Sequence, residues 1–322
     1  MRLLKFYTKS SGKETILMLN HTGLKAKLKQ YWPLYVMFIP CAVMLLIFNY
    51  YPMYGIVLAF KDYFIKLGIL GSPFAEDPLV HFKELFDDPY FLQVTGNTLR
   101  ISALRLLCGF PAPICLALLF NEVRAQRFKK SVQTILYLPY FLSWVVLGGM
   151  FKTILMNDGL INTWLGNFGI DPIPFLSDPK WFLAVTIITD IWKNMGFSSI
   201  IYLAAISGID GEQYEAAMID GADRWQRIRY ITIPGLVPAI SIQLILSLSG
   251  VLNAGFDQIF NMYSPVVYST ADIIDTYVHR IGLGDGNYEI ATALGLFKSV
   301  IGFVLILLTN KIIKRTGGEG IW

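Results

Sequence analysis

Charged side chains are scarce in this sequence. Lys, Arg, Asp and Glu make up 16% of the 322 residues, whereas soluble domains carry about 25%. Hydrophobic residues reach 54% and the mean hydropathy is +0.51. Because the apolar residues come in long blocks separated by charged ones, the composition excludes an ordinary soluble domain and predicts one integral membrane domain.

Cysteine and histidine are rare as well. Cys41, Cys108 and Cys115 lie inside apolar stretches, so no disulfide framework or metal-binding spacing is indicated. The three histidines are scattered along the chain, which supports neither a zinc site nor a catalytic dyad. The sequence has no GxxxxGK[ST] phosphate loop, so we expect this chain to bind neither ATP nor another cofactor and to be no enzyme.

Six apolar stretches are long enough to cross a hydrocarbon core of about 30 Å, which takes about 20 helical residues. We therefore predict an all-α integral membrane protein with six transmembrane helices. The first stretch is long enough to tilt or to break at Pro52. The predicted spans are residues 34–60, 96–120, 134–156, 181–206, 236–256 and 290–313.

The distribution of basic residues predicts the orientation in the membrane. Seventeen Lys and Arg fall in the segments on one side of the predicted spans and four on the other. Since Lys and Arg accumulate in cytoplasmic loops, we expect both ends of this multi-pass protein of the cell membrane to be cytoplasmic. The expected organisation is a cytoplasmic N-terminal segment 1–30, a first span 31–60, an extracytoplasmic loop 61–95, a five-helix core 96–313 and a cytoplasmic tail 314–322.

The inner connection 207–234 differs from a plain loop because it is long, helix-compatible and carries five acids against three arginines. Asp210 with Gln213 is typical of a capping box that opens a helix, and Gly221 favours a turn. We therefore predict two short helices joined at Gly221, with Pro234 ending the second.

One motif in this connection points to a family. It consists of Glu215-Ala216-Ala217, three further residues, Gly221, then Ile231 and the pair Ile233-Pro234. It resembles the EAA loop of the membrane subunits of binding-protein-dependent ABC importers, in which a Leu-Pro pair stands where this chain has Ile-Pro. The resemblance implies the MetI-like core of type I importer permeases, with a cytoplasmic coupling helix.

The residue types also suit docking on a partner protein. Ala216, Ala217 and Gly221 are small enough for two backbones to approach, and Glu215 adds a charge that fixes the register. A helix resting on the membrane surface is the alternative, but such helices are usually basic and this one is acidic. The expected ATPase-coupling residues are Glu215, Ala216, Ala217, Asp220, Gly221, Ala222, Trp225 and Pro234.

Further motifs are similar to the carbohydrate-uptake branch of that family. They are Asn97-Thr98-Leu99, Leu138-Pro139-Tyr140, Gly159-Leu160-Ile161-Asn162 and Ile191-Trp192-Lys193. Segments 253–260, 271–278 and 320–322 look like a narrower group, the permeases that import oligosaccharides or polysaccharides of plant and algal cell walls, including alginate and other uronate-rich chains.

The resemblance implies a set of partners. They are a second homologous permease subunit, two ATPase subunits that bind ATP and Mg, and an extracytoplasmic solute-binding protein that delivers the sugar. The alternative is an ion-coupled secondary sugar transporter that acts without an ATPase. Such a transporter would show repeat-related halves, and the sequence contains no convincing internal repeat.

Charges inside the predicted spans indicate a substrate path, because a charge in the bilayer normally faces protein or a water-filled passage. A lining of Arg105, Lys152 and Lys193 would favour anionic sugars. Asn194 would bind hydroxyls, and Phe197 could stack on a sugar ring. The alternative is an ion pair between Asp190 and Lys193 that neutralises both charges.

Other polar and aromatic residues complete the proposed path. Asn253 is expected to contact the substrate near the end of the fifth span, whereas Ser247 and its neighbours favour helix packing. Aromatic residues in spans also serve as packing or interfacial anchors. The candidate path residues are Arg105, Tyr137, Tyr140, Lys152, Asp190, Lys193, Asn194 and Asn253.

Overall fold

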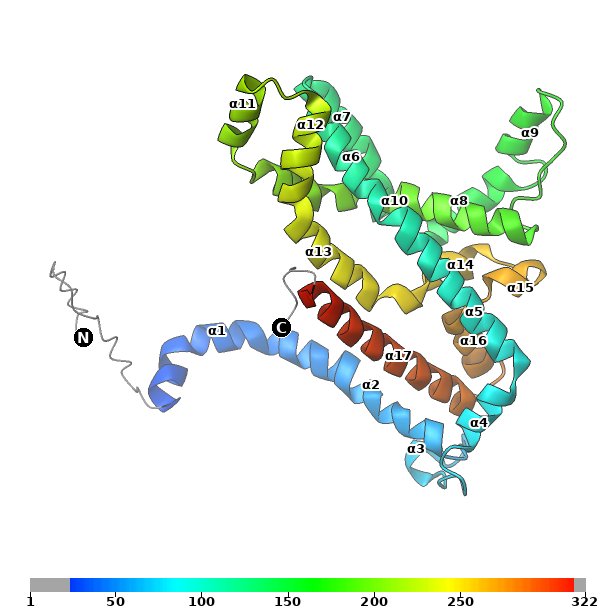
Figure 1. Ribbon diagram of the computed structural model, residues 1–322. Helices are drawn as coiled ribbons and strands as arrows, with labels where there is room; N and C mark the ends of the chain where they lie inside the picture. The colour runs from blue at the N-terminus through cyan, green and yellow to red at the C-terminus, as the bar shows by residue number, and fades with distance from the viewer. Residues whose placement is uncertain (1–23, 316–322) are drawn as a thin grey trace. The chain divides into compact units, whose positions relative to one another are not determined.

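The computed structural model describes residues 24–315 (Figure 1). Within this range every named element is a helix, and the only strand-like pairing is one isolated bridge between Lys61 and Phe74. The predicted all-α class is confirmed. The expected cytoplasmic ends extend to residues 1–23 and 316–322, which lie outside the described residues. The chain divides into two units after Tyr54.

The first unit is built from helix α1 (Leu24–Leu45), the π-helical turn η1 (Leu46–Tyr50) and α2 (Tyr51–Met53). Helix type changes next to Pro52, where a break was expected. Proline cannot donate a backbone hydrogen bond and its ring crowds the preceding turn, and the wider π turn accommodates both effects. Trp32, Met37 and Phe48 are exposed, as expected for a helix that faces lipid.

Five stretches have the length and hydropathy of membrane spans: Gln30–Phe60, Pro89–Glu122, Trp144–Gly166, Arg224–Leu248 and Tyr288–Lys311. The predicted fourth span is the 29-residue helix α10 (Pro179–Ser207), which contains Asp190 and Lys193 and is not among the five. The multi-span character is therefore confirmed, and the count of six stays a prediction.

The second span is longer than predicted. It runs through α5 (Pro89–Leu104), the π-helical turn η3 (Arg105–Gly109) and α6 (Pro111–Glu122). The Asp88 side chain caps its start by accepting a hydrogen bond from the Tyr90 backbone N–H. The π turn precedes Pro111, so the proline falls where the regular ladder is already interrupted.

The predicted third span, 134–156, is wrong as a continuous helix. It consists of α7 (Gln126–Tyr137), the 3₁₀ turn η4 (Leu138–Phe141) and α8 (Trp144–Leu155), separated by the extended residues Leu142 and Ser143. Pro139 favours the break, and Ser143 caps α8 through the Val146 N–H. Helix α9 (Leu160–Gly166) follows α8.

The inner hairpin forms as two helices joined at Gly221, whose φ is +80°. Helix α11 (Gly211–Ile219) is capped by Asp210, whose side chain accepts from the Glu212 N–H. The predicted capping box with Gln213 is wrong, because the Asp210 side chain accepts from Glu212 instead; a capping box does form at the next helix, between Asp223 and Gln226.

The second helix of the hairpin does not end at Pro234, and this prediction is also wrong. Helix α12 (Arg224–Arg227) continues through the π turn η5 (Ile228–Thr232) into α13 (Ile233–Ser249). Pro234 directly follows this π turn, where the regular ladder of helical hydrogen bonds is already interrupted. The hairpin is therefore continuous with a membrane span.

The fifth span ends earlier than the predicted residue 256. After Ser249 the chain forms the 3₁₀ turn η6 (Val251–Asn253) and reverses at Ala254 and Gly255, which both have positive φ. Helix α14 (Phe256–Met262) follows. Positive φ is costly for alanine, so the surroundings must hold this turn in place.

Short helices connect α14 with the last span. They are η7 (Pro265–Val267), α15 (Tyr268–Ala271), α16 (Ile274–His279) and η8 (Arg280–Gly284), and α17 (Tyr288–Arg315) follows. Near the other end of the second unit, η2 (Tyr54–Phe60), α3 (Gly68–Gly71) and α4 (Val80–Asp87) precede α5.

An ion pair lies among these short helices. Arg280 bonds the fully buried Asp272 at 2.5 Å. Burial, reinforced by Asp88, raises the pKa of Tyr277 nearby to about 12.

Helix α10 is central in the second unit, since it packs on α6, α7 and α13. Tyr202 and Ile206 of α10 join Ala117 of α6 and Leu236 of α13 in one buried cluster. Gly196 faces α7 so closely that a Cβ there would collide with the Leu136 carbonyl. The small residue thus sets the distance between these helices.

We expect Gly196→Ala to lower the free energy of unfolding by about 1–3 kcal/mol, because the Leu136 backbone cannot move aside as a flexible side chain would. Gly295→Ala in α17 is the matched control, since no described atom lies within 4 Å of its Cβ position. The thermal midpoint of the detergent-purified protein measures both. Equal midpoints for the two variants would contradict the close contact.

Candidate functional site

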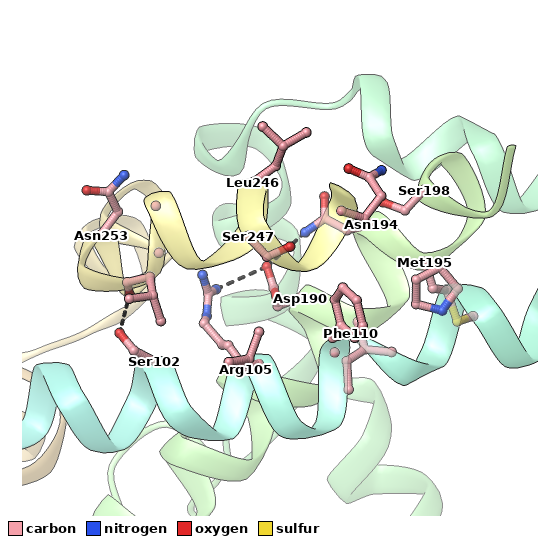
Figure 2. Close-up of a pocket in the computed structure, with 18 of the residues that line it drawn as sticks. Ser102, Arg105, Phe110, Asp190, Asn194, Met195, Ser198, Leu246, Ser247 and Asn253 are labelled. Atoms are coloured by element: carbon pink, nitrogen blue, oxygen red, sulfur yellow. Dashed lines mark hydrogen bonds and ion pairs between the residues drawn. The ribbon is translucent and has the colours of Figure 1, made fainter. Parts of the chain in front are cut away.

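A cleft of about 570 Å³ lies between the α5–η3–α6 span, α10 and α13, and residues of the turn at 250–255 also line it. Figure 2 shows its polar side chains approaching from these three helices. Two charged residues line it, Arg105 and Asp190. The neutral polar groups are Ser102, Asn194, Ser198, Tyr202, Gln243, Ser247 and Asn253.

Arg105 and Asp190 form an ion pair that joins η3 to α10. Arg105 Nη2 lies 3.1 Å from Asp190 Oδ1, and each side chain is 17% exposed. Asn194 Nδ2 donates to the same oxygen at 2.9 Å, one helical turn along α10 (Figure 2). The alternative pairing of Asp190 with Lys193 is wrong, since the carboxylate bonds Arg105 across the helices.

Gln258 of α14 completes this link, although no pattern in the sequence selects it as a site residue. Its Oε1 accepts from Arg105 Nη2, and its Nε2 donates to Thr186 O at 2.8 Å and Thr189 Oγ1 at 2.7 Å. The reversal at Gly255 brings Gln258 to Arg105. A Cβ at Gly255 would collide with the guanidinium, so glycine meets both a conformational and a steric requirement there.

Neutral polar side chains form two short rows beside the ion pair. Asn194 and Ser198 are one turn apart on α10, and Gln243 and Ser247 are one turn apart on α13. Residues at this spacing share a helix face. The rows supply amide and hydroxyl groups that both donate and accept hydrogen bonds, which suits a ligand rich in hydroxyls.

Lys193 does not line the cleft. Its Nζ donates to the Tyr140 carbonyl at 2.8 Å and lies 5.4 and 5.6 Å from the ring centres of Tyr140 and Trp144. Phe197 is stacked on Tyr140 at 4.0 Å, so this ring face is covered by protein. These residues hold the interruption between η4 and α8 against α10.

The predicted cationic lining is not assembled within residues 24–315. Arg105 is paired with Asp190, Lys193 is bound to a carbonyl, and Lys152 lines a separate cleft of about 340 Å³ with Tyr263. Tyr137 is half-buried at the end of α7 and, like Tyr140, does not line the main cleft. Four of the eight candidates meet there: Arg105, Asp190, Asn194 and Asn253.

Asn253 lines this cleft and also a neighbouring cavity. Its Oδ1 accepts from Lys298 Nζ at 2.9 Å, and Lys298 pairs with Asp275 at 2.6 Å. This second cation is therefore also compensated. Lys298 therefore adds no net positive charge to the cleft.

The inner hairpin forms a second candidate site. In Figure 1, α11 and α12 lie at the end of α13 that is far from α14 to α16. No residue of α11 or α12 is buried, and Ile219 and Trp225 are 86% and 66% exposed. A hollow of about 330 Å³ collects several of the expected coupling residues: Ala217, Asp220, Gly221 and Ala222.

Two further contacts define this hairpin. Tyr214 and Thr232 share a hydrogen bond of 3.0 Å that ties α11 to η5. Glu215 and Ala216 are exposed on α11, whereas Pro234 lies in the span rather than on the tip. An exposed surface that combines apolar, small and acidic residues is suited to contact with another protein.

Comparison with known proteins identifies the family. Residues 109–318 match the family described as binding-protein-dependent transport system inner membrane component. The chain belongs to this family. It is therefore a multi-pass inner-membrane permease subunit and no enzyme, which confirms the resemblance to importer permeases.

The permease has relatives in Bacillus subtilis. It is 43% identical to the polygalacturonan/rhamnogalacturonan transport system permease protein YteP over 93% of each chain. It is 42% identical to protein LplB over 92% of this chain and 93% of that protein.

Solved structures agree with these relatives. A crystal structure of a bacterial ABC transporter involved in the import of the acidic polysaccharide alginate contains a chain with a TM-score of 0.83 and 43% identity, covering 91% of the permease and 98% of that chain. A crystal structure of a bacterial alginate ABC transporter in complex with an alginate pentasaccharide-bound periplasmic protein gives 0.84 and 42%, with 92% and 99% covered. The MetI-like importer fold is thus confirmed.

The partly buried ion pair of Arg105 and Asp190 predicts a double-mutant result. We expect Arg105→Leu to destabilise the permease by about 3 kcal/mol, because it leaves the mostly covered Asp190 carboxylate without its cation. Arg105→Leu combined with Asp190→Leu should recover most of that loss. Thermal midpoints of the wild type, both single variants and the double variant measure the coupling. Strictly additive losses would show that the pair contributes nothing.

Proposed function

We propose that the permease is the transmembrane subunit of an ATP-driven importer that takes up oligo- or polysaccharides, including uronate-rich chains such as alginate. The observation that carries this proposal is the cleft between α5, α10 and α13, whose neutral donors and acceptors suit sugar hydroxyls. Relatives named for polygalacturonan and alginate transport, each about as long as this chain, support the substrate class.

Partners complete the importer in this proposal. A second homologous permease forms a heterodimer with this chain, and an extracytoplasmic solute-binding protein delivers the sugar. A structural relative whose periplasmic protein holds an alginate pentasaccharide supports this arrangement. Two ATPase subunits bind ATP and Mg on the cytoplasmic side, where the basic connections and both chain ends of the permease lie.

The inner hairpin would transmit the motion of the ATPases to the cleft. The helical path from Arg224 to Ser249 is continuous past Pro234 and carries Gln243 and Ser247 into the cleft. A displacement of the hairpin therefore moves one wall of the cleft. ATP binding favours the outward-open arrangement to the extent that this arrangement binds the closed ATPase pair more tightly.

The energy source separates this proposal from an ion-coupled transporter acting alone. We expect the complete importer in proteoliposomes to accumulate a uronate oligosaccharide only when ATP and the solute-binding protein are present. Uptake by the permease alone under an ion gradient would contradict the proposal. Radiolabelled sugar retained on filters measures both conditions.

The coupling role predicts the effect of charge reversal at Glu215. We expect Glu215→Lys to lower sugar-stimulated ATP hydrolysis and uptake tenfold or more, which corresponds to about 1.4 kcal/mol or more of coupling. The variant should still insert in the membrane, because Glu215 is exposed. Glu212→Lys is the matched control, with the same change on the same helix outside the EAA motif. Unchanged hydrolysis in Glu215→Lys would rule out the docking role.

A further inference from the structure

We propose that Arg105 and Asp190 together recognise two neighbouring hydroxyls of a sugar ring, so that this cleft selects for the neutral part of the substrate. The inference rests on the proposed function and names the residues that determine specificity within it. It replaces a cationic path as the basis of substrate choice in this chain.

The hydrogen-bonding capacity of the pair is only partly used. Asp190 Oδ1 accepts from Arg105 and Asn194, whereas Asp190 Oδ2 has no hydrogen-bond partner among the described residues. Arg105 Nη2 contacts Asp190 and Gln258, whereas Nη1 has no such partner within residues 24–315. Both residues line the cleft. The pair therefore offers one acceptor and one donor group to a ligand.

A sugar diol matches this combination. Each hydroxyl can donate one hydrogen bond and accept others, so one hydroxyl can donate to Asp190 Oδ2 while its neighbour accepts from Arg105 Nη1. Hydrogen bonds to charged groups are stronger than those between neutral groups. The two contacts together fix the orientation of a ring.

A carboxylate does not match it. A carboxylate only accepts hydrogen bonds, and its attraction to Arg105 is opposed by repulsion from Asp190, which is 3.1 Å from the guanidinium. The other polar groups of the cleft are neutral. The carboxylates of a uronate chain are therefore recognised elsewhere, on the second permease or on the solute-binding protein.

The test compares a neutral oligosaccharide with a uronate oligosaccharide of equal length, using the complete importer in proteoliposomes. Asp190→Asn removes the free carboxylate oxygen and leaves Arg105 as an uncompensated cation. We expect uptake of the neutral sugar to fall about tenfold and the ratio of acidic to neutral uptake to rise by at least the same factor. Asp257→Asn, an exposed acid outside this cleft, is the control and should leave the ratio unchanged.

A second variant keeps the proposal testable if Asp190→Asn fails to assemble into the importer. Arg105→Lys keeps the charge but lacks the second guanidinium arm, so neutral uptake should fall while the ratio stays nearly constant. An unchanged ratio of acidic to neutral uptake in Asp190→Asn overturns the role of the pair, and so does unchanged neutral uptake in Arg105→Lys. In either case, sugar uptake by the wild type still upholds the proposed function. A wild-type importer that takes up neither sugar overturns both.

Discussion

The link between Arg105, Asp190 and Gln258 is the constraint on which the membrane core depends. It joins three segments that are far apart in the sequence, η3, α10 and α14, through charges and amides that lipid could not solvate. The π turn at Arg105–Gly109 and the reversal at Ala254–Gly255 both occur where these segments meet. The irregular backbone is tolerated there because protein surrounds it.

Much of the architecture follows from local patterns in the sequence. Apolar blocks located the long helices except the interrupted third one, and the spacing of Glu215, Gly221 and Ile231 located the hairpin, because both features depend on near neighbours along one helix. Predictions failed where an irregular turn nearby or a distant part of the chain decides the outcome. Pro234 was expected to stop a helix, but the π turn before it removes the conflict.

The candidate site shows the same limit. Arg105, Asp190, Asn194 and Asn253 could be selected because polar groups inside spans are costly and need a reason. Gln258 could not, since its contact with Arg105 requires the turn at Gly255 that no periodic pattern indicates. Lys193 was selected for the same reason as Arg105 but bonds a carbonyl at the break between η4 and α8. Identity of the residue alone does not distinguish a path-lining cation from a structural one.

The compensation of Arg105 by Asp190 also has an electrical consequence. A lone cation that moved with the helices would sense the voltage across the bilayer at about 2.3 kcal/mol per 100 mV for a full crossing. Two opposite charges held 3.1 Å apart move together and displace almost no net charge. The free energy of a rearrangement of these helices therefore depends little on the membrane potential.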